Sequence, residues 1–507
     1  MGEVLRAGER ILEATGMTGR QWTETPRVAV VGGGLAGLAA VCALAESGLN
    51  VTLFERRAFL GGRASSYQLP GTGEVVDNCQ HVLLGCCTNL IEFYERLEVG
   101  DKIRWFDQLT FLEPGGRASV ISPSFLPAPL HTAPAFLRAS CLNLTDKLAI
   151  AAAMAALAPM APRDSGDSFL TWLRRRGQTE RAIDRFWKTL LVSALNEDMD
   201  RVSVPYAAQV LRESFLKSAS AGKMGVPTVP LAELYNSATN YVESRGGRVQ
   251  FRAVVDSFRT EFAGVKLGLG GGEEGFDFVV LAVPFDALTR ILPTTTAADP
   301  LRQALSHFET SPITGVHLWF DRQITDLDHA VLLDRTIQWM FHKSKLLSAA
   351  PASQRRAASK KSNGNGAATA VADAGAGGSY VELVVSSSKT LVEKSRSEII
   401  DLALAELREF LPASREANVV KSTVIKEVHA TYSPRPGVEV YRPRPETVWP
   451  RVFLAGDWTA TGWPATMEGA VRSGYAAAQC VARVAGIRDA AFLVPDLPPA
   501  GFMRLFG

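Results

Sequence analysis

Cysteine is scarce in this sequence, and long hydrophobic runs are missing. The 507 residues include six cysteines, none of which forms a CxxC pair or a His/Cys cluster with the spacing of metal ligands. We therefore expect free thiols in a reducing compartment, no disulfide framework and no metal site. No segment reaches the roughly 18 apolar residues that a membrane span needs. The first residues lack the apolar core of a signal peptide, so residues 1–26 are predicted to form a short helical extension.

An excess of charge of either sign is also missing. Fifty-four Lys and Arg residues stand against 52 Asp and Glu residues, which gives a net charge of +2. This balance does not indicate a nucleic-acid-binding protein. With 47% hydrophobic and 21% charged residues, the composition is typical of a soluble globular protein and excludes a disordered or coiled-coil chain. At roughly 150 residues per domain, the length predicts about three folding units.

A strand–helix–strand unit opens the globular part of the chain. Residues 27–31 form a short apolar run, residues 35–47 have helical spacing, and residues 50–55 read as a second strand. The turn after the first strand has the pattern GxGxxG. Its members are Gly32, Gly34 and Gly37, with Leu35 and Ala36 opening the helix.

This pattern predicts a dinucleotide site with a stated role for each residue. Gly32 permits the tight turn, Gly34 lets the backbone approach a pyrophosphate, and Gly37 permits close packing of helix on strand. The phosphates then lie at the helix N-terminus, where free N–H groups and the helix dipole favour negative charge. Glu55 follows 18 residues after Gly37, at the end of the second strand, where its carboxylate can accept the ribose hydroxyls.

Strand-like segments recur far along the chain, near residues 247–251, 278–284 and 451–456, with less regular stretches between them. We therefore predict an α/β protein in which a Rossmann-like domain is interleaved with an α+β substrate domain. The predicted Rossmann-like domain comprises residues 27–115, 241–295 and 430–485, the substrate domain comprises residues 116–240 and 296–429, and residues 486–507 form a tail.

Two local predictions concern the substrate domain. An Ala/Leu-rich helix is predicted to begin with Thr145 or Asp146 as its N-cap. Residues 343–378 are rich in Ser, Ala, Gly and Lys, and such a composition cannot bury enough apolar surface to offset the entropy of ordering. This segment is predicted to be a disordered surface loop, with electrostatic contact to anionic lipid head groups as the alternative.

Motifs beyond the βαβ unit carry a family resemblance. After Glu55 comes a Glu-x-x-x-x-x-Gly-Gly-Arg sequence, and residues 453–457 read Phe-Leu-Ala-Gly-Asp. Together they resemble the flavin amine oxidase and phytoene desaturase superfamily, which implies FAD as the cofactor. The turn after Gly-Asp has no cysteine, so the resemblance implies that FAD is bound non-covalently. By this resemblance, the residues that contact FAD beyond the GxGxxG turn and Glu55 are Arg56, Gly62, Arg63, Val255, Gly456, Asp457 and Met467.

A second motif is more specific. Residues 76–89 read VDNCQHVLLGCCTN and resemble the signature of the hydroxysqualene dehydroxylases, the squalene-associated FAD-dependent desaturases. The resemblance runs from about residue 27 to residue 485. Position 79 is Cys where that family usually has Gly, and a positive φ there would strain the backbone.

The resemblance implies a reductive reaction in which an allylic hydroxyl of hydroxysqualene is replaced by hydride, giving squalene in hopanoid biosynthesis. Such chemistry needs an acid for the departing hydroxyl and a dry apolar tunnel. Asp77, Gln80 and His81 are the candidate catalytic residues, because the 76–89 segment passes the flavin ring in the family. The alternative for Asp77 and His81 is a structural role in a turn. Candidate tunnel residues include Trp105, Phe106, Phe111, Phe125, Leu126, Trp172, Phe186, Trp187, Trp319 and Trp339.

Two other functions stay open. One is a carotenoid-type (phytoene) desaturase or another amine-oxidase-like flavin oxidase, which shares the FAD motifs but runs the flavin in the oxidative direction. The other is a non-enzymatic flavoprotein that carries lipid between enzymes. Because the chain has one dinucleotide fingerprint, electrons for reduction would come from free NAD(P)H or from a partner reductase.

The expected partners are a C30 isoprenoid substrate, the membrane surface and squalene-synthase-like enzymes, with no nucleic acid. A cytoplasmic protein attached peripherally to the inner face of the cell membrane is expected, since such a substrate partitions into bilayers. The segment from Phe125 to Leu142 is the predicted contact, with Phe136 and Leu137 on it and Arg138 and Lys147 beside it.

Overall fold

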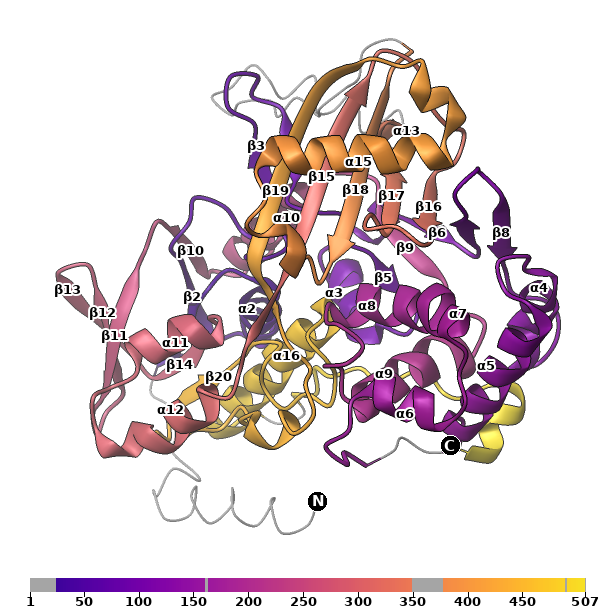
Figure 1. Cartoon of the computed structure of the whole chain (residues 1–507). Helices are drawn as coiled ribbons and strands as arrows, with labels where there is room; N and C mark the ends of the chain where they lie inside the picture. The colour runs from indigo at the N-terminus through magenta and orange to yellow at the C-terminus, as the bar shows by residue number, and fades with distance from the viewer. Residues whose placement is uncertain (1–23, 160–162, 349–376, 488–489, 507) are drawn as a thin grey trace.

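The computed structural model describes residues 24–159, 163–348, 377–487 and 490–506, which form two sheet-centred regions and a group of helices (Figure 1). The predicted N-terminal helix, apart from residues 24–26, and residues 349–376 of the predicted loop lie outside the described residues.

The first region is built on a parallel five-stranded sheet. Its order is β10 (Arg248–Phe251), β2 (Asn50–Glu55), β1 (Arg27–Val31), β14 (Phe278–Leu281) and β20 (Val452–Leu454). All four neighbouring pairs are parallel. The strands come from three distant stretches of the chain, which the apolar strand segments of the sequence had indicated.

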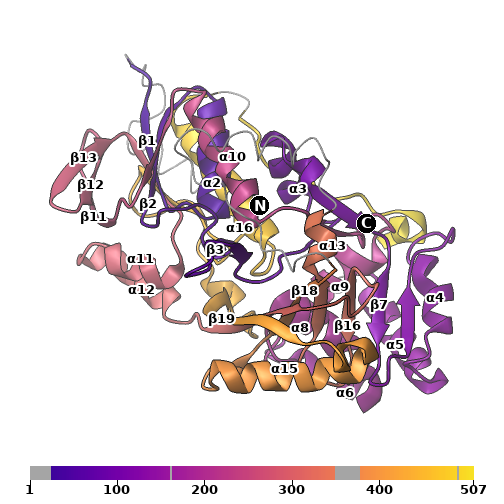
Figure 2. The same cartoon turned by 90° about the horizontal axis from the view of Figure 1, so that it is seen from above.

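Both faces of this sheet are covered, because successive side chains of a strand point to opposite faces. Val28 and Val30 pack with helices α2 (Leu35–Glu46), α10 (Leu231–Glu243) and α16 (Met467–Val484). Ala29 and Val31 belong to the cluster that includes the three-stranded sheet of β11 (Val255–Thr260), β12 (Val265–Leu269) and β13 (Gly272–Phe276). Figure 2 shows the helices and this small sheet on opposite sides of β1 and β2.

The second region is a seven-stranded mixed sheet. Its order is β19 (Val419–Tyr432), β15 (Thr310–Phe320), β18 (Ser379–Ser386), β17 (Trp339–His342), β16 (His329–Leu332), β7 (Leu109–Leu112) and β8 (Ala118–Ile121). Helix α15 (Arg396–Phe410) covers one face through Val316, Leu318, Val381 and Leu383 (Figure 1). The α/β class predicted from the sequence is thereby confirmed.

Short helices occupy the space beside the second sheet. They are α4 (Ala133–Arg138), α5 (Leu144–Leu157), α6 (Phe169–Arg175), α7 (Glu180–Ala182), α8 (Thr189–Leu195) and α9 (Val204–Leu211). The predicted N-cap of α5 was wrong. Asn143 is the N-cap and forms a capping box with Asp146, in which each side chain accepts from the other residue's backbone N–H.

The start of the predicted loop is also corrected. Residues 343–348 form helix α13 (Lys343–Ser348), and the side chain of Lys343 is only 2% exposed. Composition alone predicted that residues 343–378 are exposed to solvent. The first of them, Lys343, instead forms ion pairs with two buried carboxylates, Asp77 and Glu382.

Three smaller features complete the parts that matter for the site. β3 (Ser66–Gln68) pairs with β4 (Val75–Asp77), and β9 (Met224–Pro227) lies between β5 (Leu83–Leu84) and β6 (Ile103–Phe106). Helix α3 (Thr88–Arg96) follows β5 and contacts α16. Among the described residues, no helix is both long enough and apolar enough to cross a membrane.

Candidate functional site

A cavity of about 660 Å³ lies where the two sheet-centred regions meet. Its wall takes residues from the turn after β1, the end of β2, the segment after β4, the end of β19, and the segment between β20 and α16. Of the cofactor-binding and catalytic residues predicted from the sequence, those that line it are Gly32, Gly34, Leu35, Ala36, Glu55, Arg56, Gly62, Arg63, Gln80, His81, Val255, Gly456, Asp457 and Met467.

The N-terminus of α2 faces this cavity without a side-chain cap. Gly34 is the N-cap residue, with extended φ and ψ of −78° and 174°, and the cavity wall continues through Leu35 and Ala36. The first N–H groups of a helix have no partner inside the helix, so they and the helix dipole favour an anion there. A methyl group added to Gly34 would find only the Cα of Gly62 within 4 Å, at 3.8 Å, so the space over this glycine is open.

Gly32 and Gly37 serve the packing behind this turn. Gly32 has a φ of +109°, and a side chain on Gly37 would overlap the carbonyl oxygen of Gly32. Gly37 does not line the cavity, in keeping with the packing role expected for the third glycine of the motif.

Glu55 joins the same turn to the second strand. One oxygen of its carboxylate accepts the backbone N–H of Gly33 at 2.7 Å, and the other accepts that of Arg57 at 2.7 Å. These two bonds hold the carboxylate at the cavity wall. Each oxygen keeps a lone pair that can accept a ligand hydroxyl.

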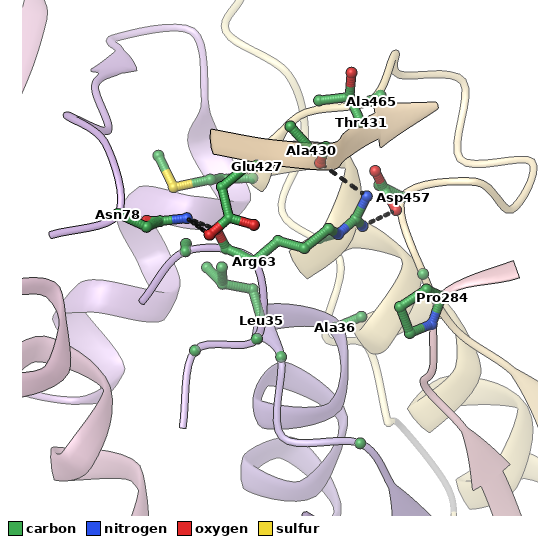
Figure 3. A pocket seen from close by; sticks show the side chains of 18 of the residues that line it. Leu35, Ala36, Arg63, Asn78, Pro284, Glu427, Ala430, Thr431, Asp457 and Ala465 are labelled. Atoms are coloured by element: carbon green, nitrogen blue, oxygen red, sulfur yellow. Dashed lines mark hydrogen bonds and ion pairs between the residues drawn. The ribbon is translucent and has the colours of Figure 1, made fainter. Parts of the chain in front are cut away.

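An ion pair crosses the cavity between two predicted cofactor residues. The guanidinium of Arg63 lies 2.5 Å from the carboxylate of Asp457 and donates to the carbonyl oxygen of Ala430 at 3.2 Å (Figure 3). Burial alone would lower the pKa of Arg63, but the charge of Asp457 outweighs it and the pKa is raised. The Gly456–Asp457 turn is held from behind by Arg442, which donates to the carbonyl oxygen of Asp457 at 3.1 Å.

The segment after β4 supplies the polar end of the cavity. The Nδ1–H of His81 donates to the carbonyl oxygen of Cys79 at 2.8 Å. A carbonyl oxygen only accepts, so Nδ1 carries the proton and Nε2 keeps the basic lone pair. Burial lowers the pKa of His81, which favours the neutral imidazole. Within the described part of the chain Nε2 has no hydrogen-bond partner, so it is free to accept a proton.

Asp77 lies behind this segment and does not line the cavity. Its carboxylate accepts from the hydroxyl of Ser66 at 2.8 Å, from the N–H of Leu231 at 3.0 Å and from Lys343 at 3.2 Å. These contacts favour a structural role for Asp77 over proton donation to a substrate. Cys79 lines the cavity, and its φ is not positive, so the condition under which Cys would strain the backbone there is not met.

Comparison with known proteins identifies the family. Residues 35–482 match the flavin-containing amine oxidoreductases. The chain belongs to this family. FAD is its cofactor, and the chain is a flavin-dependent oxidoreductase.

Several relatives span nearly the same length. The chain is 28% identical over 480 residues to a 15-cis-phytoene desaturase of Synechococcus elongatus, covering 90% of this chain and 95% of that protein. It is 26% identical over 481 residues to a zeta-carotene desaturase of a Synechocystis species, covering 90% and 97%. The crystal structure of an oxidoreductase from Methanosarcina mazei has the same fold, with a TM-score of 0.66, 16% identity, and coverage of 88% and 98%.

The cavity fits FAD on its own geometry. The open Gly34 and the uncapped start of α2 suit the pyrophosphate, the Glu55 carboxylate suits the ribose, and the Arg63–Asp457 pair provides one donor and one acceptor for the rest of the cofactor. Bound FAD supplies the group that accepts or donates hydride.

Sequence reasoning missed Glu427, which enters the cavity from β19. Its carboxylate accepts from the hydroxyl of Tyr67 at 2.7 Å. It also accepts from the side-chain amide of Asn78 at 3.2 Å (Figure 3). No motif surrounds Glu427 in the sequence. Glu427 lies at the cavity because β19 pairs with β15 at the edge of the seven-stranded sheet.

The second sheet contributes four large apolar side chains to the cavity wall. Ile313, Trp339, Phe341 and Val384 line it. Of the candidate tunnel residues, only Trp339 is among the residues that line this cavity, while Trp187 and Trp319 are almost fully buried in the core. Within the described residues, no group of three or more His, Cys, Asp or Glu side chains is arranged to hold a metal ion.

Proposed function

We propose that this chain is an FAD-dependent desaturase that removes two hydrogens from a long isoprenoid hydrocarbon. The observation that carries the proposal is the pairing of an apolar wall with His81 at the same cavity. Desaturation sends a hydride to the oxidised flavin and a proton from the adjacent carbon to a base. A neutral imidazole with a free Nε2 is such a base, and its lowered pKa keeps it unprotonated.

The relatives support the same direction of reaction. Phytoene and zeta-carotene desaturases match the chain over 90% of its length. Their names refer to long polyene hydrocarbons, for which the apolar residues Ile313, Phe341 and Val384 form a suitable wall.

Reductive dehydroxylation of hydroxysqualene is the second candidate, favoured by the resemblance of residues 76–89 to that family. In this reaction bound FAD would supply a hydride from its reduced form, and an acid of the chain must supply the proton with which the hydroxyl leaves as water. Glu427 is the carboxyl group at the polar end of the cavity that could donate that proton.

One pair of single-turnover experiments separates the candidates. Anaerobic holoenzyme with oxidised FAD is mixed with phytoene in vesicles, and photoreduced holoenzyme is mixed with hydroxysqualene. Desaturation predicts bleaching of the flavin band and a new double bond in the first mixture only. Return of the flavin band with squalene formation in the second mixture only would establish dehydroxylation, and no reaction in either would refute both proposals.

We also propose that the chain works at a lipid surface, because its substrate is insoluble in water. An apolar face, defined here by eight exposed side chains, supports this. They are Phe125, Leu130, Leu137, Leu144, Leu148, Phe502, Leu505 and Phe506. The C-terminal segment is joined to the others through the N–H of Phe502, which donates to the carbonyl oxygen of Ala128 at 2.8 Å.

The charge around this apolar face favours an anionic bilayer as its partner. Residues 114–145 and 497–507 contain no Asp or Glu, whereas Arg138 and Arg504 are exposed there. A basic rim of this kind attracts acidic lipid head groups. Only part of the predicted contact segment is exposed. Leu142 is buried, and Phe136 packs edge-on against Phe186 with ring centroids 5.6 Å apart.

The lipid proposal is tested with the double variant Leu137→Ser, Leu148→Ser. If each leucine inserts partly, each contributes about 1 kcal/mol, so partition onto anionic vesicles falls about 30-fold. Phe262→Ser is the matched control, because Phe262 is fully exposed at the hairpin between β11 and β12. Equal vesicle binding of the double variant and the control, with FAD retained in both, would refute the proposed face.

A further inference from the structure

A buried cluster of charged groups lies directly behind the polar end of the cavity. The ammonium of Lys343 is 2.7 Å from the side-chain oxygen of Gln80, 3.2 Å from the carboxylate of Asp77 and 3.5 Å from that of Glu382. The three charged side chains are 0–3% exposed, and Gln80 is 7% exposed. No predicted motif includes Lys343 or Glu382.

The lysine fixes the orientation of Gln80. Since an ammonium only donates, the oxygen of the Gln80 amide must point at Lys343, and its NH₂ group is turned to donate to the carbonyl oxygen of His81 at 3.0 Å. Gln80 and His81 both line the cavity, whereas Lys343 does not. Lys343 can therefore affect the cavity only indirectly, through Gln80, which it contacts, and His81, to which Gln80 donates.

The sheet explains how three distant segments meet here. Lys343 directly follows β17, and Phe341 of β17 pairs with Glu382 of β18. Gly315 of β15 leaves room for the segment above them, since a side chain there would lie 2.9 Å from the carbonyl oxygen of Asn78. The cavity-lining segment thus rests on the sheet face, with the lysine between it and the sheet.

We propose that Lys343 is a positioning residue, which sets the orientation of Gln80 and His81 at the cavity and so controls turnover. The proposal rests on the proposed function in one respect: turnover is measured with whichever substrate reacts. A purely structural role would require only that the positive charge balance the two buried carboxylates. The two roles predict different behaviour when one carboxylate is removed.

The positive charge of Lys343 also balances the negative charge of the buried carboxylates Asp77 and Glu382. Burial raises the pKa of Glu382 to about 7. Burial alone would lower the pKa of Lys343, but Asp77 and Glu382 outweigh it and the pKa is raised. The other titratable groups of the described residues that face the cluster come from several elements: His317 of β15, Tyr380 of β18, Tyr235 of α10, Cys79 and His81 of the cavity segment, and Glu427 of β19.

The first test is a double-mutant cycle of Lys343→Met and Gln80→Leu in the holoenzyme. Each single change should lower kcat by between about 10-fold and 10²-fold with FAD retained, because small misplacements of catalytic groups have costs of that size. The double variant should be no slower than the slower single variant. Multiplicative losses would overturn the proposal. The matched control is Lys345→Met, two residues along the same helix, where the ammonium contacts Asp326 near the surface and kcat should not change.

The second test separates positioning from charge balance. Adding Glu382→Gln to Lys343→Met removes the carboxylate that the lysine neutralised, so resistance to urea should recover while kcat stays low. Recovery of both would show a merely structural role. This double variant also keeps the test valid if Lys343→Met alone fails to fold.

A third measurement does not depend on the substrate. The imidazole of His81 is titrated by NMR in wild type and in Lys343→Met, with His81→Asn to assign its signal among the seven histidines. Burial is the main cause of the lowered pKa of His81 and the charge of Lys343 lowers it further, so the pKa should rise in the variant. An unchanged pKa would overturn the proposal. If wild type reacts with neither substrate, the proposed function fails while this measurement still tests Lys343.

Discussion

The substitution Gly34→Glu tests the FAD site most directly. Gly34 faces open space at the N-terminus of α2, with only the Cα of Gly62 nearby, so a new side chain enters the cavity and leaves the surrounding chain in place. A carboxylate about 4 Å from a phosphate charge, at an effective dielectric constant of about 20, costs about 4 kcal/mol. FAD should therefore bind roughly 10³-fold more weakly.

The assay compares FAD content with stability of the apoprotein. Purified Gly34→Glu should carry little FAD, as measured by the visible flavin band per chain, while its apoprotein unfolds in urea close to wild type. Gly34→Ala is the control for the loss of glycine, since alanine at an N-cap differs from glycine by less than about 1 kcal/mol. It lacks the carboxylate and should lose much less FAD.

Gly37→Ala provides the opposite pattern. Its methyl group would overlap the carbonyl oxygen of Gly32 and lie 3.3 Å from the Cβ of Ala282. Overpacking costs about 1–3 kcal/mol and is offset by about 1 kcal/mol of helix propensity, so the apoprotein itself should lose stability.

A fully FAD-loaded Gly34→Glu protein with an ordinary flavin spectrum would refute the assignment of the pyrophosphate to this turn.

Two further predictions concern stability. Asn143→Ala removes the cap of α5 and should lower the free energy of unfolding, measured in urea, by about 1 kcal/mol. Thr145→Ala, at an exposed neighbouring position, should change this free energy little. A larger loss for Thr145→Ala than for Asn143→Ala would contradict the capping box. Burial lowers the pKa of His317 to about 3, so the unfolded chain binds a proton that the folded chain refuses, and stability falls as pH drops from about 6.5 towards 3. In urea titrations, His317→Gln should reduce this fall in stability by up to ~1.4 kcal/mol per pH unit. Glu382, with its pKa of about 7, acts in the opposite sense between about pH 4.5 and 7, and it does so in both wild type and the variant. Equal pH dependence of stability in wild type and His317→Gln would refute the lowered pKa of His317.

Local sequence determined the cofactor half of the site. The GxGxxG turn and Glu55 act within one strand–helix–strand unit, where the geometry follows from glycine conformation, the free N–H groups of a helix start, and the length of one strand. Arg63 and Asp457 were predicted from motifs that are far apart in the chain, and they form an ion pair at the cavity. The α/β class followed in the same way from short apolar strands separated by helical segments.

Tertiary structure alone decided the other half. Glu427 reaches the cavity through the pairing of β19 with β15, and no neighbouring residue signals it. Asp77 and Gln80 are three residues apart and both contact the buried Lys343, yet only Gln80 also lines the cavity. Lys343 itself opens a Lys-rich segment whose composition indicates solvent. Composition measures the average gain from burial, whereas the two carboxylates that hold this lysine come from β4 and β18 and meet it only when the sheets are assembled.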